Sequence, residues 1–106
     1  IYVEDVARSN IQALISDQDF GMYNVGTEIQ TSINELCELI LELKNSDLKV
    51  KYNPYSEDDA RAMVKNRIGS RVKAEKEIGF KYKYELREGL QKLIDWRITT
   101  GVDKKR

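Results

Sequence analysis

The chain lacks histidine altogether and has one cysteine and one proline among its 106 residues. Without histidine, imidazole acid/base catalysis and most zinc sites are excluded. Cys37 has no partner for an intramolecular disulfide, and its apolar neighbours, among them Leu36 and Ile40, predict a packed thiol and not a reactive one. No apolar run is long enough to span a bilayer. We therefore expect a cytoplasmic protein without a membrane partner.

Two motifs of nucleotide-dependent oxidoreductases are also missing. A dinucleotide-binding loop needs closely spaced glycines between a strand and a helix, and the six glycines of this chain never show that spacing. A Tyr-x-x-x-Lys pair lowers the pKa of a tyrosine acid/base, but none of the six tyrosines has a lysine four residues later. The sequence therefore predicts no cofactor site and no catalytic residue within this chain.

The net charge of the chain is zero, but acidic and basic residues are unevenly distributed between its two halves. Residues 1–43 contain one basic residue against eight acidic ones, whereas residues 44–106 contain seventeen against ten. An anion-binding site is therefore expected in the second half. Tyr82 and Tyr84 alternate there with lysines, but the balanced total charge and the acidic first half argue against a nucleic-acid partner.

Hydrophobic periodicity predicts a small mixed α/β domain that comprises residues 1–106, with about four helices and two or three short strands. The predicted helices cover residues 4–15, 32–43, 70–78 and 84–99. A very short strand is expected before the first helix, and further strands over residues 22–25 and 48–52. Residues 56–66 fit either a helical turn or a loop that leads to an edge strand.

Local signals predict where these helices begin and end. Ser32 and Glu35 form a capping-box pattern, and Ser70 is the expected cap of the third helix. Gly79 and Gly101 are expected to end helices in the left-handed conformation, with Phe80 folding back on the third helix. Asp5 is interpreted as a residue that caps or holds the start of its own helix.

The candidate ligand-binding residues lie between Glu57 and Lys73. The run Glu57-Asp58-Asp59 has hard-cation chemistry, but consecutive carboxylates diverge and no calcium-loop glycine accompanies them, which favours solvation or ribose hydrogen bonding over a metal. Arg61 and Arg67 carry guanidinium forks that match a diphosphate. The alternative role of these arginines is to hold the local loop through carbonyls or the acidic run.

Four segments, in order along the chain, carry a family resemblance. They are Ile1-Tyr2-Val3-Glu4-Asp5-Val6-Ala7-Arg8, Tyr23-Asn24-Val25-Gly26-Thr27 with the helix that follows it, Lys73-Ala74-Glu75-Lys76-Glu77-Ile78-Gly79-Phe80, and Leu86-Arg87-Glu88-Gly89-Leu90 with Trp96. Together they resemble the C-terminal, substrate-side part of NAD-dependent nucleotide-sugar epimerases and dehydratases, in the extended short-chain dehydrogenase/reductase family.

The resemblance implies that this chain covers the nucleotide of a sugar donor. The N-terminal Rossmann domain, which binds NAD(P) and carries the Tyr/Lys pair in such enzymes, is absent from it. The family often has Arg-x-Gly-Asp after the proline-bearing strand, but here Arg67-Ile68-Gly69 is followed by Ser70. Phosphate contact would therefore pass to Arg67, the first choice, or to Arg61, and ribose contact to Asp58 or Asp59.

The expected function is substrate binding in an NAD(P)-dependent enzyme that transiently oxidises a nucleotide sugar and then epimerises, dehydrates or reduces it. The chain alone would be inactive. It should expose an apolar face where the Rossmann domain packs, and self-association into a homo-oligomer through that face is a further expectation. The competing interpretation is a non-catalytic α/β binding or scaffolding module.

Overall fold

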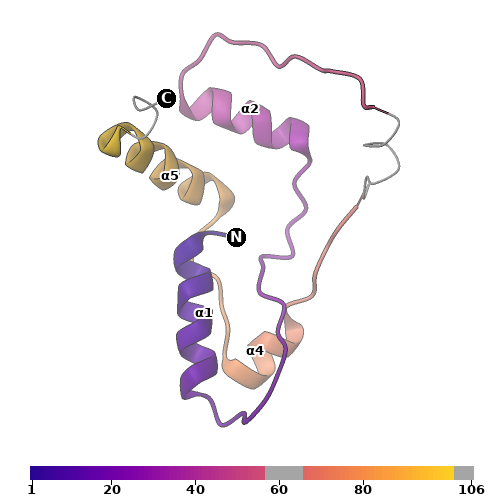
Figure 1. Ribbon diagram of the computed structural model, residues 1–106, viewed down its shortest axis with the longest axis vertical. Coiled ribbons are helices and arrows are strands. Elements are labelled where there is room, and N and C mark those ends of the chain that lie inside the picture. Colours follow the sequence, from indigo (N-terminus) through magenta and orange to yellow (C-terminus); the bar gives the residue numbers. More distant parts are fainter. Residues whose placement is uncertain (57–65, 102–106) are drawn as a thin grey trace. The chain divides into compact units, whose positions relative to one another are not determined.

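The computed structural model describes residues 1–56 and 66–101, which contain four helices and no strand (Figure 1). The helices are α1 (Val3–Ile15), α2 (Ile33–Leu43), α4 (Val72–Ile78) and α5 (Leu86–Thr100). The chain divides into two compact units. One unit comprises Ile1–Ile29 and Gly69–Arg106, with α1, α4 and α5; the other comprises Gln30–Ile68, with α2.

The four predicted helices are confirmed, with ends that differ by one or two residues. The capping box of α2 is present: the Ser32 hydroxyl accepts the Glu35 amide at 3.2 Å, and the Glu35 carboxylate accepts the Ser32 amide at 2.6 Å. Gly79 ends α4 with φ 67° and Gly101 ends α5 with φ 63°. None of the described helices is long and apolar enough to cross a bilayer.

The predicted strands are not found in the described part of the chain. Residues 22–25 and 48–52 belong to no helix and no sheet, and α1 begins directly after Tyr2. Their alternating or β-branched sequences favour extended backbone, but a strand also needs a neighbour for its N–H and C=O groups, and the described residues supply none. Of the ambiguous stretch 56–66, residues 57–65 lie outside the described residues.

The buried hydrophobic residues of the described chain gather around the end of α4. They are Ala74, Ile78 and Phe80. The left-handed Gly79 reverses the chain, so that the Phe80 amide donates to the Ala74 carbonyl at 3.1 Å and the Phe80 ring is completely buried. Packed against this core are the partly buried Ala13, Tyr23, Val25 and Tyr82, which brings α1 alongside α4 (Figure 1). The predicted return of Phe80 is thus confirmed.

The first helix, α1, has two opposite faces. Its buried residues, Asp5 and Ser9, are polar, and they face the inside of the unit to which α1 belongs. At about 100° per residue, four of its apolar side chains lie on the other side of the helix. Those side chains are exposed: Val3, Ile11, Leu14 and Ile15. We call these four residues the α1 apolar stripe. An amphipathic helix ordinarily buries such a stripe, so this side of α1 has no partner within the described unit.

Replacing Phe80 by alanine should lower the free energy of unfolding by about 3 kcal/mol, because the ring fills the small core. Phe20 is the matched control, since it is 86% exposed. Phe20→Ala should change the free energy of unfolding by less than about 0.5 kcal/mol. Urea unfolding followed by circular dichroism measures both, and equal losses in the two variants would contradict the assigned core.

Candidate functional site

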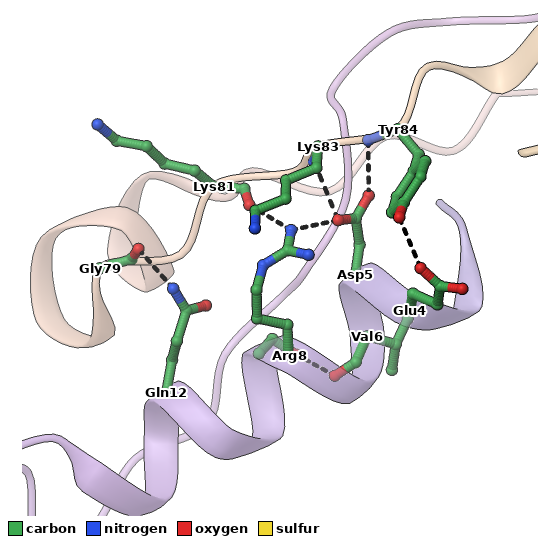
Figure 2. Close-up of polar contacts among 10 residues, drawn as sticks. Glu4, Asp5, Val6, Arg8, Gln12, Gly79, Lys81, Lys83 and Tyr84 are labelled. Carbon is green, nitrogen blue, oxygen red and sulfur yellow. Dashed lines mark hydrogen bonds and ion pairs between the residues drawn. The ribbon is translucent and has the colours of Figure 1, made fainter. Parts of the chain in front are cut away.

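A buried carboxylate joins α1 to the segment between α4 and α5 (Figure 2). Asp5 has no exposed surface, and its carboxylate accepts the backbone amides of Lys83 at 2.9 Å and Tyr84 at 3.2 Å. The Arg8 guanidinium donates to the same carboxylate and, at 2.9 Å, to the Lys81 carbonyl. We call Asp5 and Arg8, with the backbone of residues 81–84, the Asp5 cluster.

The environment of Asp5 keeps its carboxyl ionised. Burial alone would raise the pKa, but the Lys83 amide, the Arg8 guanidinium and the Tyr84 amide together outweigh burial and lower the pKa of Asp5 below its ordinary value. Of the two roles expected for Asp5, capping its own helix is wrong, whereas its bond to Arg8 does lie at the start of that helix. The N-cap is Tyr2 without a side-chain bond, and the carboxylate serves backbone amides far along the chain. Asp5 is therefore a structural residue.

Two tyrosines of the same unit are held in their neutral form. The Tyr84 hydroxyl donates to the Glu4 carboxylate at 2.6 Å, and this bond raises the pKa of Tyr84. Burial, followed by the neighbouring Glu77 carboxylate, raises the pKa of Tyr23. A tyrosine that exchanges a proton in catalysis needs a pKa lowered toward neutrality, so neither residue is suited to that role.

Two basic residues near the predicted anion site are engaged within the chain. The Arg71 guanidinium donates to Glu75 at 2.7 Å and to the Thr27 carbonyl, and it lies 5.0 Å from the centre of the Tyr82 ring. Lys73 donates to the Met22 carbonyl at 3.3 Å and lies 5.0 Å from the centre of the Tyr23 ring. These cations hold residues 22–27 against α4. Ion pairs join Arg71 to Glu75 at 2.7 Å and Lys73 to Glu77 at 4.0 Å.

Arg67 contrasts with these two cations. It lies on the irregular stretch 66–70 that leads to α4, it is exposed, and within the described part of the chain no hydrogen bond or ion pair holds it. The other predicted ligand residues, Arg61, Asp58 and Asp59, lie outside the described residues. Of the predicted site, Arg67 is the residue that lies within the described part of the chain.

The sequence did not point to Glu28, which the structure places at the start of α4. Its carboxylate accepts the Arg71 amide at 2.7 Å and the Ser70 hydroxyl, and the Arg71 bond is the main reason that the pKa of Glu28 is lowered. Arg71, and not the predicted Ser70, is the N-cap of α4, and the Glu28 carboxylate meets its amide; the Ser70 hydroxyl accepts the Val72 amide at 3.4 Å. Only the Gly26-Thr27 turn signal lies near this residue in the sequence.

A surface depression of about 540 Å³ lies where α1 and α4 end. Its lining includes Gln12, Asp17, Lys76 and Glu77, and the Gln12 amide donates to the Gly79 carbonyl at 3.0 Å. Charges of both signs line it and Arg67 does not, so it is not the predicted phosphate site. Across the described ranges 1–56 and 66–101, no three acidic, cysteine or histidine side chains gather as metal ligands.

Comparison with known proteins finds several that are named as enzymes of UDP-sugars. The chain is 32% identical over 105 residues to UDP-glucuronic acid decarboxylase 6 of Arabidopsis thaliana, which covers 98% of this chain and 29% of that protein. It is 33% identical over 101 residues to the bifunctional UDP-glucose 4-epimerase and UDP-xylose 4-epimerase 3 of the same plant, covering 91% of this chain and 28% of the relative. A putative UDP-glucose 4-epimerase of Methanocaldococcus jannaschii is 29% identical over 96 residues, 91% of this chain and 29% of its own length.

These matches relate the chain to UDP-sugar epimerases and decarboxylases, as its resemblance to nucleotide-sugar epimerases predicted. The chain spans 28–29% of the length of these relatives. No protein-family model matches it, and no solved structure does.

Asp5→Asn should lower the free energy of unfolding by about 2 kcal/mol, because the amide cannot replace an ionised acceptor for two backbone amides and a guanidinium. The exposed Asp19 gives the matched control Asp19→Asn, which removes a carboxylate outside the cluster. Denaturant unfolding at pH 7 compares the two variants, and an equal effect would contradict the structural role of Asp5.

The same comparison should depend on pH. Because the pKa of Asp5 is lowered in the folded chain, its stabilising contribution is present above the unfolded pKa of about 4 and is lost as the pH falls through the folded pKa. The difference between the parent chain and Asp5→Asn should therefore be largest near neutral pH and shrink below about pH 4. A difference that stays constant from pH 7 to pH 2.5 in urea titrations would refute this origin.

Proposed function

We propose that this chain is the C-terminal, substrate-binding portion of an NAD(P)-dependent enzyme that epimerises, decarboxylates or dehydrates a UDP-sugar. The observation that carries the proposal is its similarity, over nine tenths of its length or more, to less than a third of several UDP-sugar enzymes. In such an enzyme a preceding Rossmann domain supplies the cofactor site and the proton-transferring tyrosine, neither of which has a motif in this chain.

The two faces of α1 support this arrangement. The polar face is occupied by the Asp5 cluster, while the α1 apolar stripe on the opposite side is exposed. Burying four such side chains is favourable by several kcal/mol in total, at about 25 cal/mol per Å² of apolar surface. We propose that the Rossmann domain covers this stripe. The same domain would give residues 22–25 and 48–52, which belong to no helix or sheet in this structure, neighbouring strands, and so produce the predicted α/β character.

Within this enzyme, Arg67 binds the diphosphate of the UDP-sugar, with Arg61 as a second candidate and with Asp58 or Asp59 near the ribose. Arg67 is supported by its exposure and by the contrast with Arg71 and Lys73, whose side chains already hold the fold together. A guanidinium can form two parallel hydrogen bonds to phosphate oxygens, which orients the ligand as well as binding it. The contribution of this chain is thus binding and orientation, while hydride transfer takes place on the cofactor-binding domain.

A non-catalytic binding or scaffolding module is the second candidate. The absence of a cofactor motif and of a Tyr-x-x-x-Lys pair from this chain agrees with it. The two candidates differ in their expected binding of UDP. A scaffolding module is not expected to bind UDP, whereas the substrate-side portion of a UDP-sugar enzyme has residues that bind the phosphates of UDP. Titration with UDP therefore separates the two.

UDP titrated into the chain should shift the backbone NMR signals around Arg67, and Arg67→Ala should weaken binding about tenfold, because a charge-assisted hydrogen bond to phosphate is lost. Lys51→Ala is the control, since Lys51 is an exposed basic residue in the same unit as Arg67. It should leave the Kd for UDP unchanged. Equal losses in both variants would indicate non-specific charge attraction, and an unchanged Kd in Arg67→Ala would remove Arg67 from the site.

Joining the chain to the Rossmann domain of a related UDP-sugar enzyme tests the whole proposal. The hybrid should convert a UDP-sugar in an NAD-dependent reaction, and Arg67→Ala should raise its KM for the sugar nucleotide more than its KM for the cofactor. Leu14→Lys, which places a charge in the α1 apolar stripe, should prevent the two parts from associating. A folded hybrid that binds NAD but never turns over any UDP-sugar would favour the scaffolding module.

A further inference from the structure

Glu28 has a backbone conformation that is unusual for its residue type. Its φ is 59°, in the left-handed region that glycine and asparagine enter most easily. The other non-glycine residue with positive φ in the described chain is Asn45, an ordinary occupant of that region. A glutamate stays in this region only when its surroundings compensate the strain. The interaction that stabilises this backbone conformation is therefore expected among the contacts of the Glu28 side chain.

Those contacts attach the turn to the residues just after Arg67. The Glu28 carboxylate accepts the Arg71 amide at 2.7 Å, and the Arg71 guanidinium donates in return to the Thr27 carbonyl. The Gly69 backbone also approaches Asn24, since a Cβ at position 69 would lie 3.7 Å from the Asn24 Cβ. Residues 69–71 are thus fixed against residues 24–28 by bonds from both partners.

We propose that Glu28 and Arg71 are positioning residues for the phosphate-binding Arg67, an inference that rests on the proposed function of Arg67. Arg67 lies four residues before Arg71 in the chain, so the anchored residues 69–71 begin two residues after it. Ordering the residues that follow Arg67 before the ligand arrives reduces the conformational entropy that binding would otherwise cost. The left-handed backbone conformation of Glu28 directs its carboxylate toward the start of α4.

Glu28→Gly separates positioning from stability. Glycine relieves the positive φ while removing the carboxylate, so the two effects on folding oppose each other, and the urea midpoint should change little. The Kd for UDP should nonetheless rise about fivefold, because the approach to Arg67 is no longer fixed. Asn45→Gly is the matched control: it also relieves a positive φ, but Asn45 follows α2 and none of its hydrogen bonds in the described chain goes to residues 66–71. It should leave the Kd unchanged.

A double-mutant cycle tests whether Glu28 acts through Arg67. In the Arg67→Ala background, Glu28→Gly should weaken UDP binding no further, because the group that it positions is gone. Additive losses would overturn the inference, since they would mean that Glu28 affects the ligand by another route. If Arg67→Ala itself leaves the Kd unchanged, the proposed phosphate site is wrong and the positioning role falls with it.

A measurement without ligand tests the positioning directly. Backbone ¹⁵N relaxation of Arg67, Ile68 and Gly69 should show lower order parameters in Glu28→Gly than in the parent chain and in Asn45→Gly. Unchanged order at these three amides would overturn the inference even if Arg67 proves to bind UDP. The failure of the inference is thereby distinguished from the failure of the proposed function.

Discussion

The ionised carboxylate of Asp5 is the interaction on which the larger unit depends. The backbone between α4 and α5 forms no helix or strand, so its amides at Lys83 and Tyr84 need acceptors from elsewhere, and Asp5 supplies both. An isolated buried carboxylate would be costly, but the Arg8 guanidinium and these amides surround it. This arrangement holds the segment that follows Phe80 against α1, and it makes the polar side of that helix its inward side.

That orientation explains the unusual distribution of apolar groups. Because α1 uses Asp5 and Ser9 to contact its own chain, its apolar stripe faces outward, and the hydrophobic core of the described residues is limited to Ala74, Ile78 and Phe80. A domain that evolved to stand alone would be expected to bury the stripe and hydrogen-bond the polar face to water. The reverse arrangement agrees with the proposed function, in which a Rossmann domain covers the stripe.

Sequence reasoning predicted the structural features that depend on residues adjacent in the chain and missed those that depend on residues far apart in it. The capping box of α2 and the left-handed stops at Gly79 and Gly101 follow from local chemistry, and all three are present. The predicted strands are not found in the described chain, because a strand requires a partner that its own residues cannot specify. Asp5 and Glu28 were likewise beyond local reasoning, since their carboxylates serve amides 78 and 43 residues away. Arg67 remains a prediction based on residue type and family resemblance.

Asp5 and the backbone amides that donate to it, those of Lys83 and Tyr84, are far apart in the sequence, and this affects how the chain folds. The larger unit is assembled from both ends of the chain, so α1 cannot close on its partners until residue 84 has been synthesised. The α2 helix between them carries its own capping box and can form as soon as its residues are free, because its contacts are local. During synthesis, both faces of α1 therefore stay uncovered until then; in the proposed enzyme, the Rossmann domain is made first and covers the apolar stripe in that interval.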